Sequence, residues 1–188
     1  GGTVTVPNGM PFSLSALHFN TNNLDSYWTI IGETNTLTAP ALCLVSNGNA
    51  YIWSTLTGTD GLTKAGRGIL CLNTSNNLFS GTVQSLNGNL FAETDLSLGR
   101  VPDVYTPDAV VLDGGSLGNY TGMLTLHPNR GVTAGPSGAY LLGRTDGGVD
   151  GASPITGIGP VCIMQEQAAV TLSNPNNDYA GGTIVGAA

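Results

Sequence analysis

Basic residues are scarce in this chain. Lys and Arg together number 5 against 12 Asp and Glu among 188 residues, for a formal net charge of -7. Nucleic acids and anionic membrane surfaces attract proteins through basic patches, and this sequence has none to offer. The composition therefore argues against both as partners. No apolar run reaches the roughly 20 residues of a membrane helix.

The start of the chain lacks two common features. No charged-then-apolar leader opens it, and its first residue is Gly1 rather than Met. Both observations fit a mature product whose signal was removed, and both fit a module of something longer.

Charged residues make up only 9% of the chain, yet 40% of its residues are hydrophobic. Disordered chains combine low hydrophobicity with high charge, so this composition excludes that class. Gly, Asn, Thr, Ser and Leu dominate, which is typical of a protein rich in β-strands and turns. The length suits one domain with a substantial core, and we expect residues 1–188 to form a single unit.

Cysteine is also rare. Cys43, Cys71 and Cys162 each lie inside a short apolar run, none is part of a CxxC pair, and their odd number leaves at least one unpaired in a lone chain. We expect buried free thiols that pack as small hydrophobic groups. One disulfide stays open as an alternative in an oxidising compartment.

Short strands bounded by Asn, Gly, Ser or Thr recur along the chain. No stretch sustains a helical period over three turns, and the best helix candidate, residues 164–169, is too short to be stable alone. Residues 93–99 form an excursion with room for one helical turn. Residues 100–107 are expected to be a loop, because their two prolines disfavour a central strand, and residues 145–153 form a Gly/Asp-rich loop. The expected strands are residues 2–7, 12–19, 27–31, 36–37, 41–45, 50–55, 86–92, 109–112, 116–117 and 123–126.

Two stretches, residues 58–83 and 157–184, share one design. Leu72 corresponds to Leu172, the pair Asn76 and Asn77 to Asn176 and Asn177, and Phe79 to Tyr179. Such self-similarity indicates a repeat architecture. Polar corners at equivalent places favour stacked rungs, with Asn side chains able to form ladders. We therefore predict an all-β, right-handed parallel β-helix (β-solenoid). The alternative is an antiparallel β-sandwich or jelly roll.

The order of motifs resembles the autotransporter-associated β-strand repeat, also called the passenger-associated transport repeat, of bacterial surface proteins. Residues 60–72, DGLTKAGRGILCL, are similar to the start of that repeat, and residues 177–184, NDYAGGTI, to its core; residues 77–82 form a degenerate core. The second stretch lacks the Leu-Thr-Lys start. The resemblance implies a parallel β-helix and an extracellular or cell-surface location.

Catalytic motifs are weak. Residues 114–118 match GxSxG around Ser116, but that nucleophile elbow needs a helix after the turn and none is predicted. His18 and His127 have no Cys, Asp or Glu at metal-ligand spacing. We expect no catalytic, cofactor-binding or metal-binding residues, and hence no enzyme.

Carboxylates and aromatic side chains leave two further possibilities. Oxygen-rich loops can hold calcium, but solvated loops are the better interpretation here; the carboxylates concerned are Asp103, Asp108, Asp113, Asp146 and Asp150. Tyr27, Trp28, Tyr51 and Trp53 lie in two early strands that could stack one rung apart. They would either fill the N-terminal core or form an exposed ladder that stacks on sugar rings.

The first and last segments are strand-forming and carry no charge, and neither has a proline at its very tip. Charge and proline are the usual protections of an exposed strand edge. We therefore expect a non-catalytic extracellular structural protein, a surface module or filament subunit, whose partners are copies of itself or neighbouring modules end to end. The first alternative is a β-helix that binds or cleaves surface glycans. A third reading is an antiparallel sandwich from a fibre or capsid-like assembly.

Overall fold

The computed structural model describes residues 1–6, 12–13, 16–19, 27–32, 36–38, 42–165 and 168–187. Within these residues the chain forms 23 short strands and one 3-10 turn. Every strand-to-strand pairing is parallel. The prediction of an all-β solenoid is confirmed, and the antiparallel sandwich is wrong. No helix in the described part is long and apolar enough to cross a membrane.

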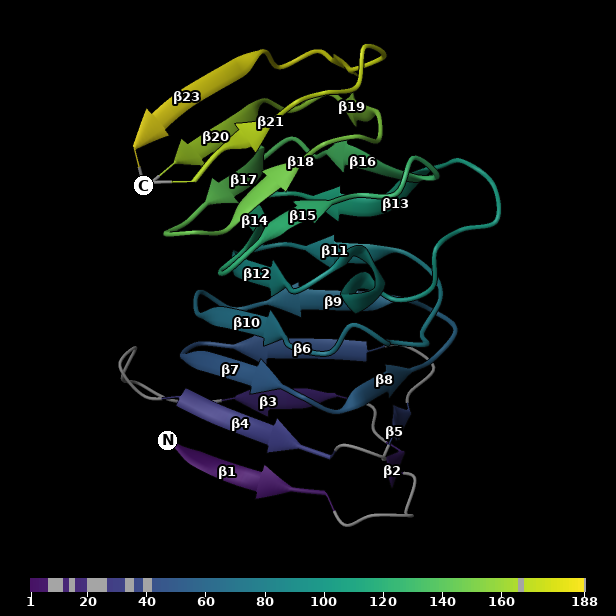
Figure 1. Ribbon diagram of the computed structural model, residues 1–188, viewed down its shortest axis with the longest axis vertical. Coiled ribbons are helices and arrows are strands. Elements are labelled where there is room, and N and C mark those ends of the chain that lie inside the picture. The colour runs from purple at the N-terminus through teal and green to yellow at the C-terminus, as the bar shows by residue number, and fades with distance from the viewer. Residues whose placement is uncertain are drawn as a thin grey trace.

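The strands stack along the long axis of the molecule, with β1 at one end and β23 at the other (Figure 1). Each coil crosses a nine-stranded sheet, turns a corner, crosses an eight-stranded sheet and returns. The nine-stranded sheet comprises β1 (Gly2–Thr5), β4 (Tyr27–Ile31), β7 (Asn49–Ile52), β10 (Ile69–Leu72), β12 (Gly88–Ala92), β14 (Gly115–Asn119), β17 (Ala139–Gly143), β20 (Val161–Gln165) and β23 (Thr183–Ala187). The eight-stranded sheet comprises β3 (Leu17–Phe19), β6 (Leu42–Ser46), β9 (Leu62–Ala65), β11 (Val83–Ser85), β13 (Thr106–Leu112), β16 (Arg130–Ala134), β19 (Ile155–Gly157) and β22 (Asp178–Tyr179).

The third side of the solenoid is less regular. Three strands form a small sheet near the N-terminal end and three more near the C-terminal end: β2 (Phe12–Ser13), β5 (Thr36–Thr38) and β8 (Thr55–Thr57), then β15 (Met123–Thr125), β18 (Gly148–Asp150) and β21 (Val170–Thr171). In the coils between them no third strand is described. One of these coils carries the 3-10 turn η1 (Asp95–Leu98), which confirms the expected helical turn.

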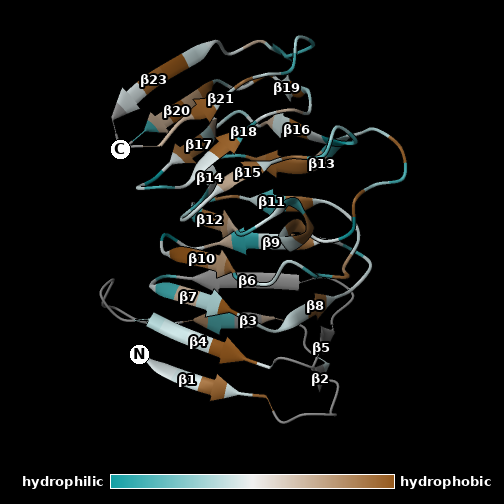
Figure 2. Ribbon diagram, in the orientation of Figure 1, coloured by the Kyte–Doolittle hydropathy of each residue, from teal (hydrophilic) through white to brown (hydrophobic). Residues whose placement is uncertain are grey.

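The core is a set of aliphatic rows held in register by the parallel pairing. In the nine-stranded sheet Leu70 pairs with Leu90, Leu90 with Leu117 and Leu117 with Leu141, and all four side chains are at most 1% exposed. Apolar segments accordingly recur from strand to strand along the stack (Figure 2). Burial of each such side chain stabilises the fold by about 1.5–3 kcal/mol.

Glycine forms one corner of the stack. Gly48, Gly68 and Gly88 lie immediately before or at the start of β7, β10 and β12. A Cβ atom on Gly68 would collide with the backbone of Gly48, and one on Gly88 would collide with that of Gly68. Gly88 also has a φ of 65°, which L side chains rarely adopt. The corner therefore requires glycine for close coil-to-coil approach.

A buried lysine side chain stabilises the same corner of the stack. Lys64 on β9 is fully buried, and its Nζ donates to the carbonyl oxygens of Ala65 (3.0 Å), Gly66 (2.7 Å) and Asn87 (2.8 Å). The ammonium thus joins a turn in one coil to a turn in the next. Burial lowers the pKa of Lys64 to about 8.

Asn77 and Asn177, at corresponding places in the two similar stretches, make the same kind of contact, but on different sides of the solenoid. The Oδ1 of Asn77 accepts from the Leu56 amide at 2.8 Å, and that of Asn177 accepts from the Ile155 amide at 2.9 Å. In each case an Asn side chain satisfies a backbone N–H in the preceding coil. Asparagine here bonds to backbone rather than to another amide.

Several expectations need correction. Residues 100–107 are not all loop, because β13 begins at Thr106 and includes Pro107, with a register shift before Val110 that accommodates the proline. The loop expected at 145–153 contains β18. Met164, where the helix candidate judged too short begins, lies in strand β20. The sequence interpretation also missed β16 and β17.

Candidate binding surface

The outer face of the nine-stranded sheet carries two rows of side chains. Register places Tyr51, Cys71 and Phe91 in one row across β7, β10 and β12. Trp53, Asn73 and Glu93 form the second row, each one residue beyond its strand. Their backbone N–H groups continue the ladder by donating to Ile30, Ile52 and Leu72 respectively. Residues 20 positions apart in the sequence therefore lie side by side.

A hollow of about 190 Å³ opens between these rows, and we call it the outer-face pocket. It exists because the middle coil carries small residues, Cys71 and Asn73, between coils that carry aromatic ones. Strands about 4.8 Å apart place the coil of Tyr51 about 10 Å from the coil of Phe91. The lining residues are Tyr51, Trp53, Cys71, Asn73, Phe91, Ala92, Glu93, Asn119, Tyr120 and Thr121.

The aromatic wall around Tyr120 is tightly packed. The rings of Phe91 and Tyr120 lie with centroids 4.1 Å apart, and the Arg144 guanidinium lies 5.0 Å from the Tyr120 centroid and donates to its hydroxyl at 2.9 Å. Gly118 leaves room for this arrangement, because a Cβ there would come 2.9 Å from the Phe91 ring. The ring and the hydroxyl of Tyr120 therefore already have partners.

The polar lining is partly engaged and partly free. Asn119 is 4% exposed; its Nδ2 donates to the Glu93 carbonyl oxygen at 2.8 Å and its Oδ1 accepts from the Thr121 amide at 3.1 Å. In the part of the chain that the structure describes, the side chains of Asn73 and Glu93 make no hydrogen bond. Asn73 is half-buried and Glu93 exposed. The pocket therefore offers an amide and a carboxylate to a ligand.

Two ionisable side chains of the pocket have raised pKa values. Burial raises the pKa of the Cys71 thiol to about 12, with Arg144 opposing the shift. Burial also raises the pKa of Tyr51. Both groups stay protonated at neutral pH, so neither supplies a nucleophile.

The four aromatic residues singled out from the sequence divide into two roles. Trp28 packs against the hydrophobic core, with its ring beside Gly2. Tyr27 is 57% exposed and meets Tyr51 edge to face at 6.2 Å, while Trp53 is 49% exposed. Packing thus accounts for Trp28, and Tyr51 and Trp53 line the outer-face pocket.

The weak catalytic candidates lie apart from one another. Ser116 sits within β14, with no helix following it, is 3% exposed and donates to Asn89 Oδ1 at 3.0 Å. His18 is exposed on β3. His127 Nδ1 accepts from the Asn129 amide at 3.1 Å. Ser116 and His127 thus make structural hydrogen bonds.

The acidic candidates are likewise dispersed. Asp113 accepts from the Ser137 amide at 2.7 Å and Asp150 from the Ser173 hydroxyl at 2.6 Å, which are loop-stabilising contacts. Asp103, Asp108 and Asp146 are exposed. In the described ranges no three His, Cys, Asp or Glu side chains gather where a metal ion could be held.

The described thiols are free and buried. Cys71 and Cys162 form no disulfide, as expected from the sequence. The side chain of Cys43, the turn at residues 8–9 and the corner at residues 20–23 lie outside the described residues.

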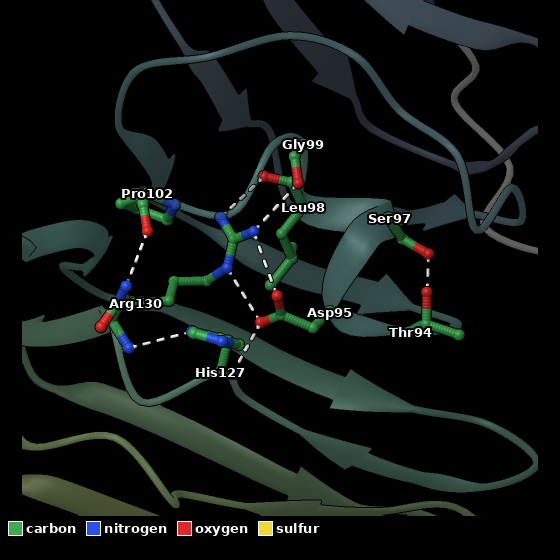
Figure 3. A network of polar contacts seen from close by, with 9 residues as sticks. Thr94, Asp95, Ser97, Leu98, Gly99, Pro102, His127 and Arg130 are labelled. Atoms are coloured by element: carbon green, nitrogen blue, oxygen red, sulfur yellow. Dashed lines mark hydrogen bonds and ion pairs between the residues drawn. The ribbon is translucent and has the colours of Figure 1, made fainter. Parts of the chain in front are cut away.

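Sequence interpretation missed a buried ion pair between Asp95 in η1 and Arg130 in β16 (Figure 3). Arg130 Nε donates to Asp95 Oδ1 at 2.9 Å, and its Nη2 donates to Asp95 Oδ2 at 3.2 Å. The same guanidinium donates to the carbonyl oxygens of Leu98 (3.1 Å) and Gly99 (2.9 Å). Asp95 also accepts from the His127 amide at 3.0 Å. This group, the Asp95–Arg130 clamp, ties the η1 coil to the next coil.

The chain is similar to part of an autotransporter adhesin. Over 185 residues, 97% of this chain, it is 36% identical to the adhesin BmaC autotransporter of Brucella suis biovar 1 (strain 1330). The chain spans only 5% of the length of that relative. No protein-family model matches the chain, and no solved structure matches it. The resemblance to an autotransporter protein is thus supported, whereas the particular repeat family has no match.

Proposed function

We propose that this chain is a non-catalytic extracellular module of a surface protein, and that its coils stack end to end on neighbouring modules or on copies of itself. Two findings support the first part. The described chain is a parallel β-solenoid, and its 36% identical relative is an autotransporter adhesin, a kind of protein found at the cell surface. Since the chain spans 5% of that relative, about twenty segments of this size would fill it.

The proposed stacking is supported mainly by the two exposed apolar edge strands of the nine-stranded sheet. β1 and β23 are its outermost described strands, so within the described residues each has one edge without a neighbouring strand. Their side chains are open to solvent as well: Val4 is 52%, Ile184 54% and Val185 73% exposed. Unpaired N–H and C=O groups on such strands are templates for a further strand.

A contact between two modules would repeat the strand pairing between coils within one module. β20 and β23 pair over five residues in parallel register, and a next coil would meet β23 in the same way. One edge of the module meets the opposite edge of its neighbour, so the contact is head to tail. Because each added coil continues along the axis of the stack, the assembly does not close into a ring. Growth of this kind produces a linear stack.

Light scattering over a concentration series tests the proposal. The native chain is expected to increase in mean mass with concentration. Val185→Lys should reduce that increase, because a charge on an edge strand opposes pairing. The matched control is Val104→Lys, since Val104 is 72% exposed on a loop rather than on an edge strand. A native chain that stays monomeric at the highest concentration, or equal behaviour of the two variants, contradicts end-to-end stacking.

A further inference from the structure

The outer-face pocket is an exposed hollow on the outer face of the nine-stranded sheet. Its floor is Cys71, which is 1% exposed, and its volume of about 190 Å³ corresponds to about six water molecules at ~30 Å³ each. The size suits one small ring rather than a peptide segment. An aromatic side chain, Trp53, is exposed to 49% at its margin.

The Trp53 ring and the polar side chains of Asn73 and Glu93 favour a ligand with both an apolar face and hydroxyl groups. The Asn73 amide supplies two donors and one acceptor, and the Glu93 carboxylate supplies acceptors only. The C–H face of a pyranose ring is apolar and slightly positive, which complements the negative face of an indole ring. Sugar hydroxyls both donate and accept, so they match Asn73 and Glu93 together.

Two rival ligand classes fit less well. A quaternary ammonium needs several open aromatic faces around it, but Tyr120 is already engaged by Phe91 and Arg144. An acidic sugar would meet the Glu93 carboxylate in a chain with a net charge of -7. Of these three classes, a neutral sugar therefore fits the pocket best.

We infer that the outer-face pocket is a binding subsite for one neutral sugar ring, which stacks on Trp53 and hydrogen-bonds through its hydroxyls to Asn73 and Glu93. The site binds the sugar without cleaving it, because the pocket presents a single carboxylate and glycoside hydrolysis uses a pair. This subsite goes beyond the stacking role, since it lies on the outer face of the sheet and not at its ends.

An NMR titration of the full chain tests the subsite. The probes are the methyl glycosides of glucose, galactose, mannose and N-acetylglucosamine, with methyl glucuronide and tetramethylammonium as the charged rivals. At least one neutral glycoside should shift the amide signals of Asn73 and Glu93 saturably, with a dissociation constant on the order of 1 mM. Methyl glucuronide should bind more weakly than its neutral counterpart.

Variants connect the signal to the pocket. Trp53→Ala should weaken the best glycoside about tenfold, as loss of one aromatic contact implies, and Asn73→Ala provides a second variant that leaves every ring in place. The control is Tyr105→Ala, because Tyr105 is a comparably exposed aromatic residue, at 42%, that lies outside the pocket. Saturable binding of none of the neutral glycosides overturns the inference. So does preferential binding of tetramethylammonium, or equal loss in Tyr105→Ala. End-to-end stacking can fail without affecting this result, and the reverse also holds.

Discussion

Removal of the Asp95 carboxylate should destabilise the fold far more than removal of a surface charge. In Asp95→Ala the Arg130 guanidinium, 1% exposed, keeps its bonds to Leu98 and Gly99 but loses both bonds to the carboxylate. The amide of His127 loses its acceptor too. A buried charge is left without its counter-charge.

Two estimates of the cost agree. Breaking a buried ion pair by removing one partner costs about 3–5 kcal/mol. Two hydrogen bonds to a charged group, at about 1.5–3 kcal/mol each, give a similar range. Asp95 is 14% exposed, so water can enter the vacated space and the lower end applies. We expect a loss of about 3 kcal/mol in the free energy of unfolding, or about 6–12 °C in Tm.

Urea denaturation followed by circular dichroism measures this loss, provided the m-value is unchanged. Asp103→Ala is the matched control, because Asp103 is an exposed carboxylate eight residues away in the same coil. Its effect should stay within about 0.5 kcal/mol. If Asp95→Ala costs no more than Asp103→Ala, the clamp behaves as a solvated surface pair and the burial argument is wrong. Exposed pairs contribute only about 0–1 kcal/mol.

Two further predictions concern buried polar side chains. Since burial lowers the pKa of Lys64 to about 8 while an unfolded lysine titrates near 10.5, the unfolded chain holds more protons between these values, so this lysine makes stability rise with pH there. Cys71, with its pKa raised to about 12, makes stability fall with pH above pH 9. The Tm of the native chain is therefore compared with that of Lys64→Met at each pH, because both proteins contain Cys71 and the difference reports Lys64 alone. A difference that stays constant from pH 8 to 10 contradicts the lowered pKa of Lys64. Asn77→Ala should cost about 2–4 kcal/mol in the free energy of unfolding, because two buried backbone groups lose their partners. Asn177→Ala, which breaks one hydrogen bond in a half-buried place, should cost about 1 kcal/mol by urea denaturation; equal costs would show that burial does not decide between the two.

The sequence predicted the fold class because solenoid corners are local features. Glycine and asparagine at turns such as residues 87–88 can be identified without knowing what they pack against. The loop prediction at Pro107 was wrong because it used a local rule, that a proline disfavours a regular central strand. Strand β13 contains a register shift that the sequence does not reveal. Strands β16 and β17 were missed because glycine-rich residues surround them.

The outer-face pocket needed information that is not local. Tyr51, Cys71 and Phe91 recur every 20 residues, as do Trp53, Asn73 and Glu93, so the two rows follow once the coil length is known. Composition gives no such length. The Asp95–Arg130 clamp was harder still, since its partners are 35 positions apart and lie in coils of unequal size.

The coils differ in length, and the extra residues of the longer coil lie outside the nine-stranded sheet. Leu70 pairs with Leu90, 20 residues later, but Leu90 pairs with Leu117, 27 residues later. The longer coil holds η1 and the loop between η1 and β13. This loop stands away from the stacked strands in Figure 1. Its register shift falls in the eight-stranded sheet, at β13, whereas β12 and β14 pair without a break.

The nine-stranded sheet is therefore the regular scaffold of the molecule. Because its described strands keep register from coil to coil, the side chains on its outer face form continuous rows, and a hollow there depends only on which residues occupy the rows. Cys71 and Asn73 create one by being small between aromatic neighbours. A larger residue at Asn73, which is half-buried, would close the pocket without disturbing the ladder beneath it, whereas Cys71 is 1% exposed and leaves no space for one. The shape of this face can therefore change at Asn73 while the solenoid that supports it stays the same.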